Sequence, residues 1–195
     1  MEQKGKKTVV KHAKLSKELI EDAAIKLVKE QGFDNLSYRG LARSLEVSPQ
    51  SLYPYVDNLS QLEVMVIVHY LNSLIDELQD NLIGVSGREA LEEYAKVFYS
   101  FTKNHLEFSK VFSAAANHPD SSSIDDQFKR MRKILEKAMH YIDADHDTIM
   151  NHITLLVTNL MGYVVMQDLN FFDQNDPLPE NFESNIKVII DSFEN

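Results

Sequence analysis

Apolar residues recur along this chain at three- and four-residue intervals, and helix-capping residues separate the resulting segments. In the first segment, Leu19, Ala23 and Leu27 form a stripe, Ser16 precedes it as an N-cap and Gly32 follows it as a stop. Only 6 glycines and 5 prolines are present in 195 residues, so few positions interrupt such segments. The pattern predicts an all-α protein of about nine helices.

Two short segments follow the first helix and are joined by a brief turn. Ser37 can cap a helix that ends about Ser44. Ser48 followed by Pro49 can start another, because a proline at the first helical position lacks an N–H that would be unpaired there anyway. Two short helices propped by a longer one form a helix-turn-helix unit, a common DNA-binding motif.

Charge is distributed unevenly along the chain. The net charge of -10 alone argues against nucleic-acid binding. However, residues 1–60 hold 10 Lys/Arg against 8 Asp/Glu, whereas residues 61–195 hold 10 against 22. We expect a basic flexible arm over 1–14, a three-helix DNA-binding head over 15–60 and a larger, acidic helical-bundle body over 61–195. A helix over 58–82 is expected to connect head and body.

The second short helix carries side chains suited to a major groove. Leu52 and Val56, four residues apart, are expected to face inward and anchor it. Glutamine can pair with adenine, and serine and tyrosine hydroxyls can reach bases or phosphates. The predicted outer face comprises Pro49, Gln50, Ser51, Tyr53 and Tyr55. The N-cap residue Ser48 is predicted to bind DNA together with them.

The segment LSYRGLARSLEVSPQSLYPYVDNLSQL resembles the N-terminal signature of the tetracycline-repressor (TetR/AcrR) family. The resemblance covers about residues 15–80. It implies a ligand-responsive transcriptional regulator, in most cases a repressor, that binds a palindromic operator in double-stranded DNA as a homodimer. It also implies the roles of individual residues: Arg39 contacts phosphate or a base, Pro49, Gln50 and Ser51 read bases, and Tyr53 and Tyr55 bind backbone phosphates.

Three positions depart from the family pattern. Glu46 replaces a turn glycine where positive φ is favoured, and Leu59 stands where many members have a phosphate-binding lysine. Pro54 lies late in the recognition helix and can end it early. These departures leave a second function open, that of a regulatory coactivator or interaction protein that has lost tight DNA binding.

The body is rich in aromatic residues and methionine, which can form either an ordinary core or an apolar pocket. The resemblance, rather than this composition, implies a pocket for a small-molecule effector. His105 and His152 could orient a polar group of that effector. Ordinary core packing is the alternative for each of these residues. The predicted ligand-binding residues are Tyr94, Phe98, Phe101, His105, Phe108, Phe112, Met131, Leu135, His152 and Leu156.

The last two helices are expected over about 146–170 and 180–193. The first of them is apolar on more than one face and must therefore be covered on more than one side. Gly162 permits close approach of another helix. In the family that the head resembles, these two helices form a four-helix bundle across a twofold axis. The predicted dimer residues are Ile153, Val157, Leu160, Val164, Ile186, Ile189, Ile190 and Phe193.

A metal-dependent hydrolase is a third possibility. His140, Asp143, Asp145, His146 and Asp147 supply metal-ligand types at close spacing. They straddle an expected loop, however, where acidic residues also cap helices. The sequence contains no glycine-rich phosphate loop and no nucleophile motif. We therefore expect no enzymatic activity, no metal site and no cofactor apart from an unknown effector.

Three features that the sequence lacks indicate the expected cellular location of the protein. It contains no cysteine, which excludes disulfides and thiol chemistry. No stretch reaches about 18 consecutive apolar residues, and the first residues have no signal-peptide core. We expect a cytoplasmic protein that does not enter a membrane.

Overall fold

The computed structural model describes residues 15–119, 122–171 and 181–194, and over these ranges the chain is all-α. This confirms the predicted fold class. Short 3-10 helices span Phe33–Asn35, Pro49–Ser51 and Met139–Tyr141. The α-helices are α1 (Lys17–Gln31), α2 (Tyr38–Ser44), α3 (Leu59–Asn81), α4 (Gly87–Asn104), α5 (Phe108–Asn117), α6 (Ser122–Ala138), α7 (His146–Asp168) and α8 (Phe182–Asp191).

Side-chain caps fix where several helices begin. Ser16, Ser37 and Asn58 each accept a hydrogen bond from a backbone N–H three residues ahead, at 3.2, 3.1 and 2.9 Å. The sequence Ser86-Gly-Arg-Glu89 has the pattern of a capping box, but the Ser86 side chain makes no capping hydrogen bond, so this expectation is wrong. The next residue, Gly87, has a φ of 61°, so α4 starts with a left-handed residue instead.

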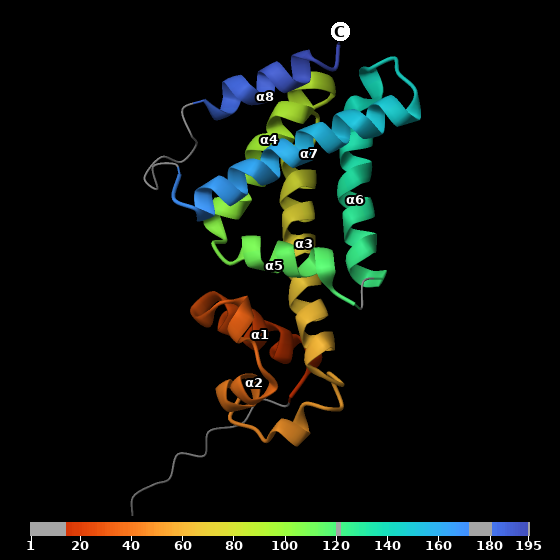
Figure 1. Ribbon diagram of the computed structural model, residues 1–195. Coiled ribbons are helices and arrows are strands. Elements are labelled where there is room, and N and C mark those ends of the chain that lie inside the picture. Colours follow the sequence, from red (N-terminus) through yellow and green to blue (C-terminus); the bar gives the residue numbers. More distant parts are fainter. Residues whose placement is uncertain (1–14, 120–121, 172–180, 195) are drawn as a thin grey trace, which may run out of the picture.

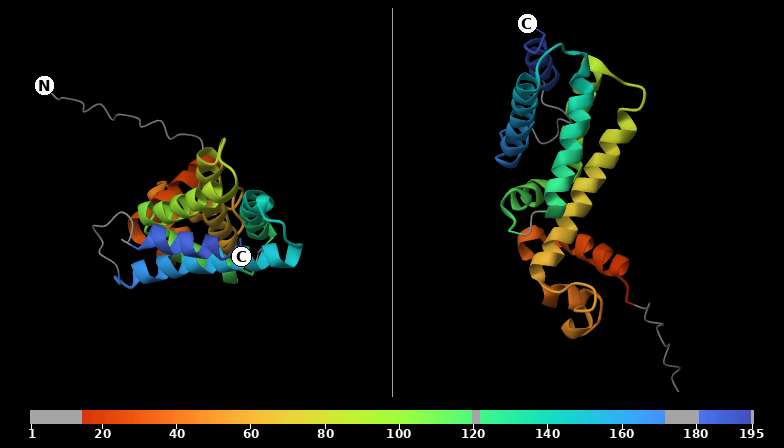
Figure 2. Two further views of the ribbon diagram at one scale, coloured as in Figure 1. Left: turned by 90° about the horizontal axis from the view of Figure 1, so that it is seen from above. Right: turned by 90° about the vertical axis from the view of Figure 1, so that its right-hand side faces the viewer.

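Helix α3 is the common axis of the molecule. It runs from the head, where it packs on α1, into the body, where α4, α5 and α6 surround it (Figure 1). Figure 2 shows α3 and α6 side by side, with α7 and α8 together at one edge of the body. Leu62 and Val66 of α3 are fully buried near the head, and Leu74 and Leu78 are fully buried in the body. One helix therefore belongs to both cores.

Polar contacts fix α3 where head and body meet. Toward the head, Nδ1 of His69 lies 3.1 Å from Oε1 of Glu21 on α1. Toward the body, the hydroxyl of buried Tyr70 donates a hydrogen bond to Glu107, just before α5. Burial and this carboxylate raise the pKa of the Tyr70 phenol well above its ordinary value. These directional contacts add to apolar packing and define the orientation of the head.

The turn between the two short head helices contains a strained residue. Glu46 has a φ of 55°, in the left-handed region that favours glycine. Its N–H still donates to the carbonyl of Arg43, at 3.2 Å, and the next N–H donates to Ala42 at 3.0 Å. The turn thus has the geometry of a glycine-containing turn although glutamate occupies it, as the sequence predicted.

Replacing Glu46 with glycine should stabilise the head. Relief of the left-handed penalty, less the added chain entropy of glycine, should raise the free energy of unfolding by about 0.5–1 kcal/mol. Urea denaturation measures the change. Glu46→Ala, which keeps the penalty, is the control and should give no gain. A Glu46→Gly variant that is less stable than the alanine variant would contradict this account of the turn.

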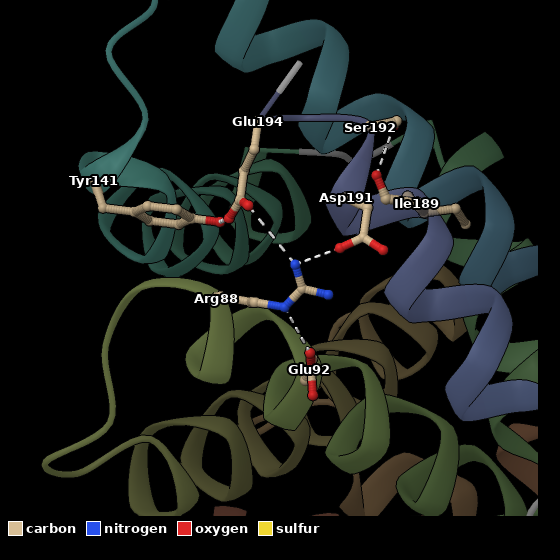
Figure 3. Close-up of polar contacts among 7 residues, drawn as sticks. All are labelled: Arg88, Glu92, Tyr141, Ile189, Asp191, Ser192 and Glu194. Atoms are coloured by element: carbon tan, nitrogen blue, oxygen red, sulfur yellow. Dashed lines mark hydrogen bonds and ion pairs between the residues drawn. The ribbon is translucent and has the colours of Figure 1, made fainter.

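Arg88, at the start of α4, holds the end of α8 (Figure 3). Its guanidinium pairs with Asp191 of α8 and, at 3.1 Å, with Glu92 of its own helix. A third carboxylate, Glu194, lies 3.7 Å from Arg88 and accepts a 3.0 Å hydrogen bond from the hydroxyl of Tyr141. Burial and that hydrogen bond raise the pKa of the Tyr141 phenol to about 12. The cluster joins α4, the connection before α7 and the end of α8.

Loss of this cluster should loosen the end of α8 locally. In an Arg88→Met variant, amide hydrogen exchange over residues 188–194 should be about two- to fivefold faster, because half-exposed ion pairs contribute modestly. Lys96→Met is a matched control, since it removes one ion pair, to Glu183, at the start of α8. Equal acceleration along the whole of α8 in both variants would show that Arg88 has no local role.

Candidate nucleic-acid interface and effector cavity

The recognition segment is short. It consists of the 3-10 helix Pro49–Ser51 and a turn that ends at Tyr55, so the helix does not continue through Pro54, in agreement with the sequence prediction. Leu52 and Val56 are fully buried, as expected, and the N–H of Val56 donates to the carbonyl of Leu52 at 3.0 Å. The predicted DNA-contacting residues therefore lie on a compact turn that Leu52 and Val56 anchor in the core of the head.

Most of the predicted DNA-contacting side chains are exposed on the head. Arg39, Gln50 and Tyr53 point into solvent, and Tyr53 is 54% exposed. The hydroxyls of Ser48 and Ser51 are also exposed and lie 3.0 Å apart, sharing a hydrogen bond. Pro49 is half-buried.

Tyr55 differs from the prediction. Its side chain is half-buried, and its hydroxyl donates a 2.7 Å hydrogen bond to the carbonyl of Leu15, ahead of α1. The phosphate-binding role expected for Tyr55 is therefore corrected to a structural one, because its hydroxyl proton is already used within the head.

The sequence prediction omitted Tyr38. Its ring stacks on that of Tyr53, with ring centroids 5.3 Å apart and planes inclined by 28°. Burial, together with nearby Tyr53 and Asp57, raises the pKa of Tyr38. The stack supports Tyr53 from α2, and no local sequence signal indicates such a contact.

The basic arm over 1–14 lies outside the described residues.

The body contains a cavity of about 510 Å³ between α4, α5, α6 and α7. Five of the predicted ligand-binding residues line it: Tyr94, Phe98, Phe112, Met131 and Leu135. The sequence prediction missed the rest of the wall, which comprises Asp125, Phe128, Lys129, Arg132, Met150, Ile153, Thr154, Val157 and Thr158. An apolar cavity of this size suits a small organic molecule.

The other five predicted ligand residues pack as ordinary core. Nδ1 of His105 lies 3.0 Å from the carbonyl of Phe101, and the two rings stack at 4.1 Å. Phe108 meets Phe101 edge-on, with centroids 5.1 Å apart. His152 stacks on Phe193 at 4.4 Å, and Leu156 is fully buried. These residues do not line the cavity, so the core alternative applies to them.

The residues predicted for the dimer interface lie on the correct helices, but most of them face the protomer's own core. At most 5% of each of Ile153, Leu160, Val164, Ile186, Ile190 and Phe193 is exposed. Ile153 and half-buried Val157 line the cavity instead, and Ile189 is also half-buried. The assignment is corrected for the six buried residues, because a side chain inside one protomer cannot contact another. The assignment of half-buried Val157 and Ile189 stays a prediction.

The exposed apolar surface lies on other positions of the same helices and just beyond α7. It comprises Leu155, Val165, Met166, Leu169, Phe171 and Val188, which are 39–74% exposed. A groove of about 590 Å³ crosses this face at Gly162, where a Cβ atom would meet no atom within 4 Å. An 18-residue window of α7 has a mean hydropathy of 1.4, which membrane-spanning and soluble core helices both reach, and only 28% of it is buried. The described residues thus leave an apolar face uncovered on α7 and α8.

The candidate metal cluster does not assemble in the described ranges. Over 15–119, 122–171 and 181–194, no group of three or more His, Asp or Glu side chains is placed to hold an ion. Asp145 instead caps α7 by accepting a 2.8 Å hydrogen bond from the N–H of Thr148. That hydrogen bond lowers the pKa of the Asp145 carboxyl. The capping role raised as the alternative is therefore the one observed.

Known proteins share both the head sequence and the overall fold. The model of the bacterial regulatory proteins of the tetR family matches residues 20–58. Over 176 residues, the chain is 20% identical to YobS of Bacillus subtilis (strain 168), an uncharacterized HTH-type transcriptional regulator, and the match covers 90% of this chain and 91% of YobS.

Two solved structures illustrate the fold. BioQ with its natural double-stranded DNA operator superposes with a TM-score of 0.66 at 18% identity, covering 93% of this chain and 99% of BioQ. A TetR variant from Acinetobacter baumannii AYE in complex with minocycline also gives 0.66, at 19% identity, covering 93% and 97%. At such identities these likenesses show a shared fold.

Proposed function

We propose that this chain, whose residues 20–58 match the model of the tetR family of bacterial regulatory proteins, is an effector-responsive repressor of that family that binds a palindromic operator as a homodimer. Members of this family are DNA-binding transcription factors rather than enzymes. The observation that carries the proposal is the head surface, where Arg39, Gln50 and Tyr53 are exposed around a buried anchor. Glutamine can pair with adenine, and arginine with phosphate or guanine.

A dimer accounts for the uncovered face of α7 and α8. Exposed apolar side chains such as Leu155, Met166 and Val188 favour burial against a second apolar surface. A second copy of the same face provides such a surface under twofold symmetry. Twofold symmetry would also give two heads, which must lie about 34–36 Å apart to enter successive major grooves.

Helix contacts connect the cavity with the head, so that binding of an effector can displace the head. Its walls include α4 and α6, and both helices pack along α3. Helix α3 in turn contacts α1 of the head through His69 and Glu21. A ligand that binds one arrangement of these helices more tightly than another changes the spacing of the two heads, whereas equal affinity changes nothing.

Substitution of Gln50 tests the DNA-reading surface. In Gln50→Ala, selection from random duplexes should return a motif with relaxed preference at one position per half-site, since a bidentate contact contributes about 1–3 kcal/mol of discrimination. Gln79→Ala, on the exposed side of α3 in the body, should leave the motif unchanged.

Duplex binding by the unmodified protein tests the alternative function, that of an interaction protein that has lost tight DNA binding. If the protein binds no duplex even at low salt, it is an interaction protein that has lost DNA binding. An unchanged motif in Gln50→Ala would contradict the base-reading role of this residue.

Charged substitutions on the uncovered face test the dimer. Leu155→Lys and Met166→Lys place an ammonium in the proposed interface, where an unpaired charge is costly, and should raise the dimer dissociation constant at least about 100-fold. Ile83→Lys is the control, because Ile83 is 77% exposed between α3 and α4, away from this face. Sedimentation measures the assembly state. Dimers that persist in both interface variants, or that dissociate in the control, would contradict the assignment.

A further inference from the structure

Basic residues of the acidic body are concentrated on one helix. Residues 61–195 hold 10 Lys/Arg against 22 Asp/Glu. Half of those ten cations lie in one nine-residue stretch of α6, residues 129–137. These five are Lys129, Arg130, Arg132, Lys133 and Lys137, and Glu136 is the acid among them. The segment is therefore strongly positive within a negative body.

Two of the five cations stand at the cavity. Lys129 and Arg132 line it, three residues apart on one face of α6, whereas Arg130, Lys133 and Lys137 do not. Arg132 forms no ion pair within the described part of the chain, and Lys129 pairs only with exposed Asp126, at 3.1 Å. A positive charge at the rim is thus available to a ligand.

Asp125 is the one acidic residue among the described residues that line this cavity. It precedes Arg132 by seven residues, which is about 10 Å along a helix. Lys129 follows Asp125 by only four residues, about 6 Å along the helix, so Arg132 is the rim cation that lies farther from the acid. We therefore expect an anionic group of a bound molecule to meet Arg132 first.

The interior of the cavity is apolar and aromatic. Phe98, Met131 and Ile153 form buried parts of the wall, and Phe112 and Phe128 are half-buried beside them. Tyr94 is 1% exposed and stacks on Phe98, with ring centroids 6.4 Å apart. The interior part of this wall contains no acidic side chain among the described lining residues, so the charge of a cationic ligand would be buried without an opposite charge beside it.

We infer that the cavity takes an amphipathic anion, namely a long-chain carboxylate whose chain lies among the aromatic residues and whose carboxylate meets Arg132 and Lys129. This inference rests on the proposed effector role of the cavity and names the chemical class of the effector. Arginine presents paired N–H donors that match the two oxygens of a carboxylate. The chain gains by leaving water, while the carboxylate stays at the rim.

Calorimetric titration with dodecanoate, dodecanol and dodecyltrimethylammonium tests the ligand class on the full chain. Dodecanoate should bind at least about tenfold more tightly than the other two. Arg132→Gln should weaken dodecanoate binding about five- to tenfold and leave dodecanol binding unchanged, because only the charge contact is lost. Lys133→Gln, on the same helix away from the cavity, is the matched control and should bind dodecanoate normally.

Two results would overturn the inference. One is equal or tighter binding of dodecanol or the ammonium probe. The other is a loss in Lys133→Gln as large as that in Arg132→Gln, which would reveal a diffuse attraction to α6.

Affinity for the selected duplex, measured with and without dodecanoate, separates this inference from the proposed function. Saturable dodecanoate binding that leaves duplex affinity unchanged would support the ligand class and contradict the effector role. Failure of dodecanoate to bind a protein that still binds its duplex would overturn the ligand class alone.

Discussion

The structure depends on the burial of a single helix in two cores. Helix α3 has 23 residues and is therefore about 35 Å long, enough to pass through the head and most of the body. Leu62 and Val66 complete the small core of the head, which would otherwise have only α1, α2 and a short turn to cover it. Because the same helix is enclosed by α4, α5 and α6, the head cannot reorient without a change in body packing.

Apolar packing alone would leave the angle between head and body poorly defined, because it is non-directional. Hydrogen bonds at the junction supply the direction. His69 meets Glu21 of α1, and the neighbouring residue Tyr70 donates to Glu107 before α5. Adjacent residues on α3 thus contact the head and the body, so a displacement of α3 at the junction affects both contacts.

The sequence predicted the helices well because their signals are local. Caps such as Ser16, Ser37 and Asn58 act on N–H groups three residues away, and the turn at Glu46 requires only a left-handed residue. The use of Tyr55 was not predictable in this way. Its hydrogen-bond partner, Leu15, lies 40 residues away in the sequence, and the pattern around Tyr55 carries no trace of it.

The same limit explains the misassigned faces of α7. Apolar residues surround this helix, so periodicity cannot indicate which of them meet the protomer's own core. Only packing separates Leu160 and Val164, which are buried, from Leu155 and Met166, which are exposed. The cavity in the body was half predicted for a similar reason. Residues on α4 were identified from their aromatic character, but the contribution of Lys129 depends on how α6 is rotated.

Helix α7 brings the cavity and the uncovered face together. Ile153 and Val157 line the cavity, whereas Leu155 and Met166 lie on the outer face of the same helix. A rigid helix that moves on one side must also move on the other, since interiors are close-packed and transmit displacement. Under the proposed function, a ligand in the cavity would therefore act on two elements, α3 toward the head and α7 toward a partner. In the proposed symmetric dimer, both displacements would change the distance between the two heads, and that distance would determine whether both recognition segments can enter one face of DNA.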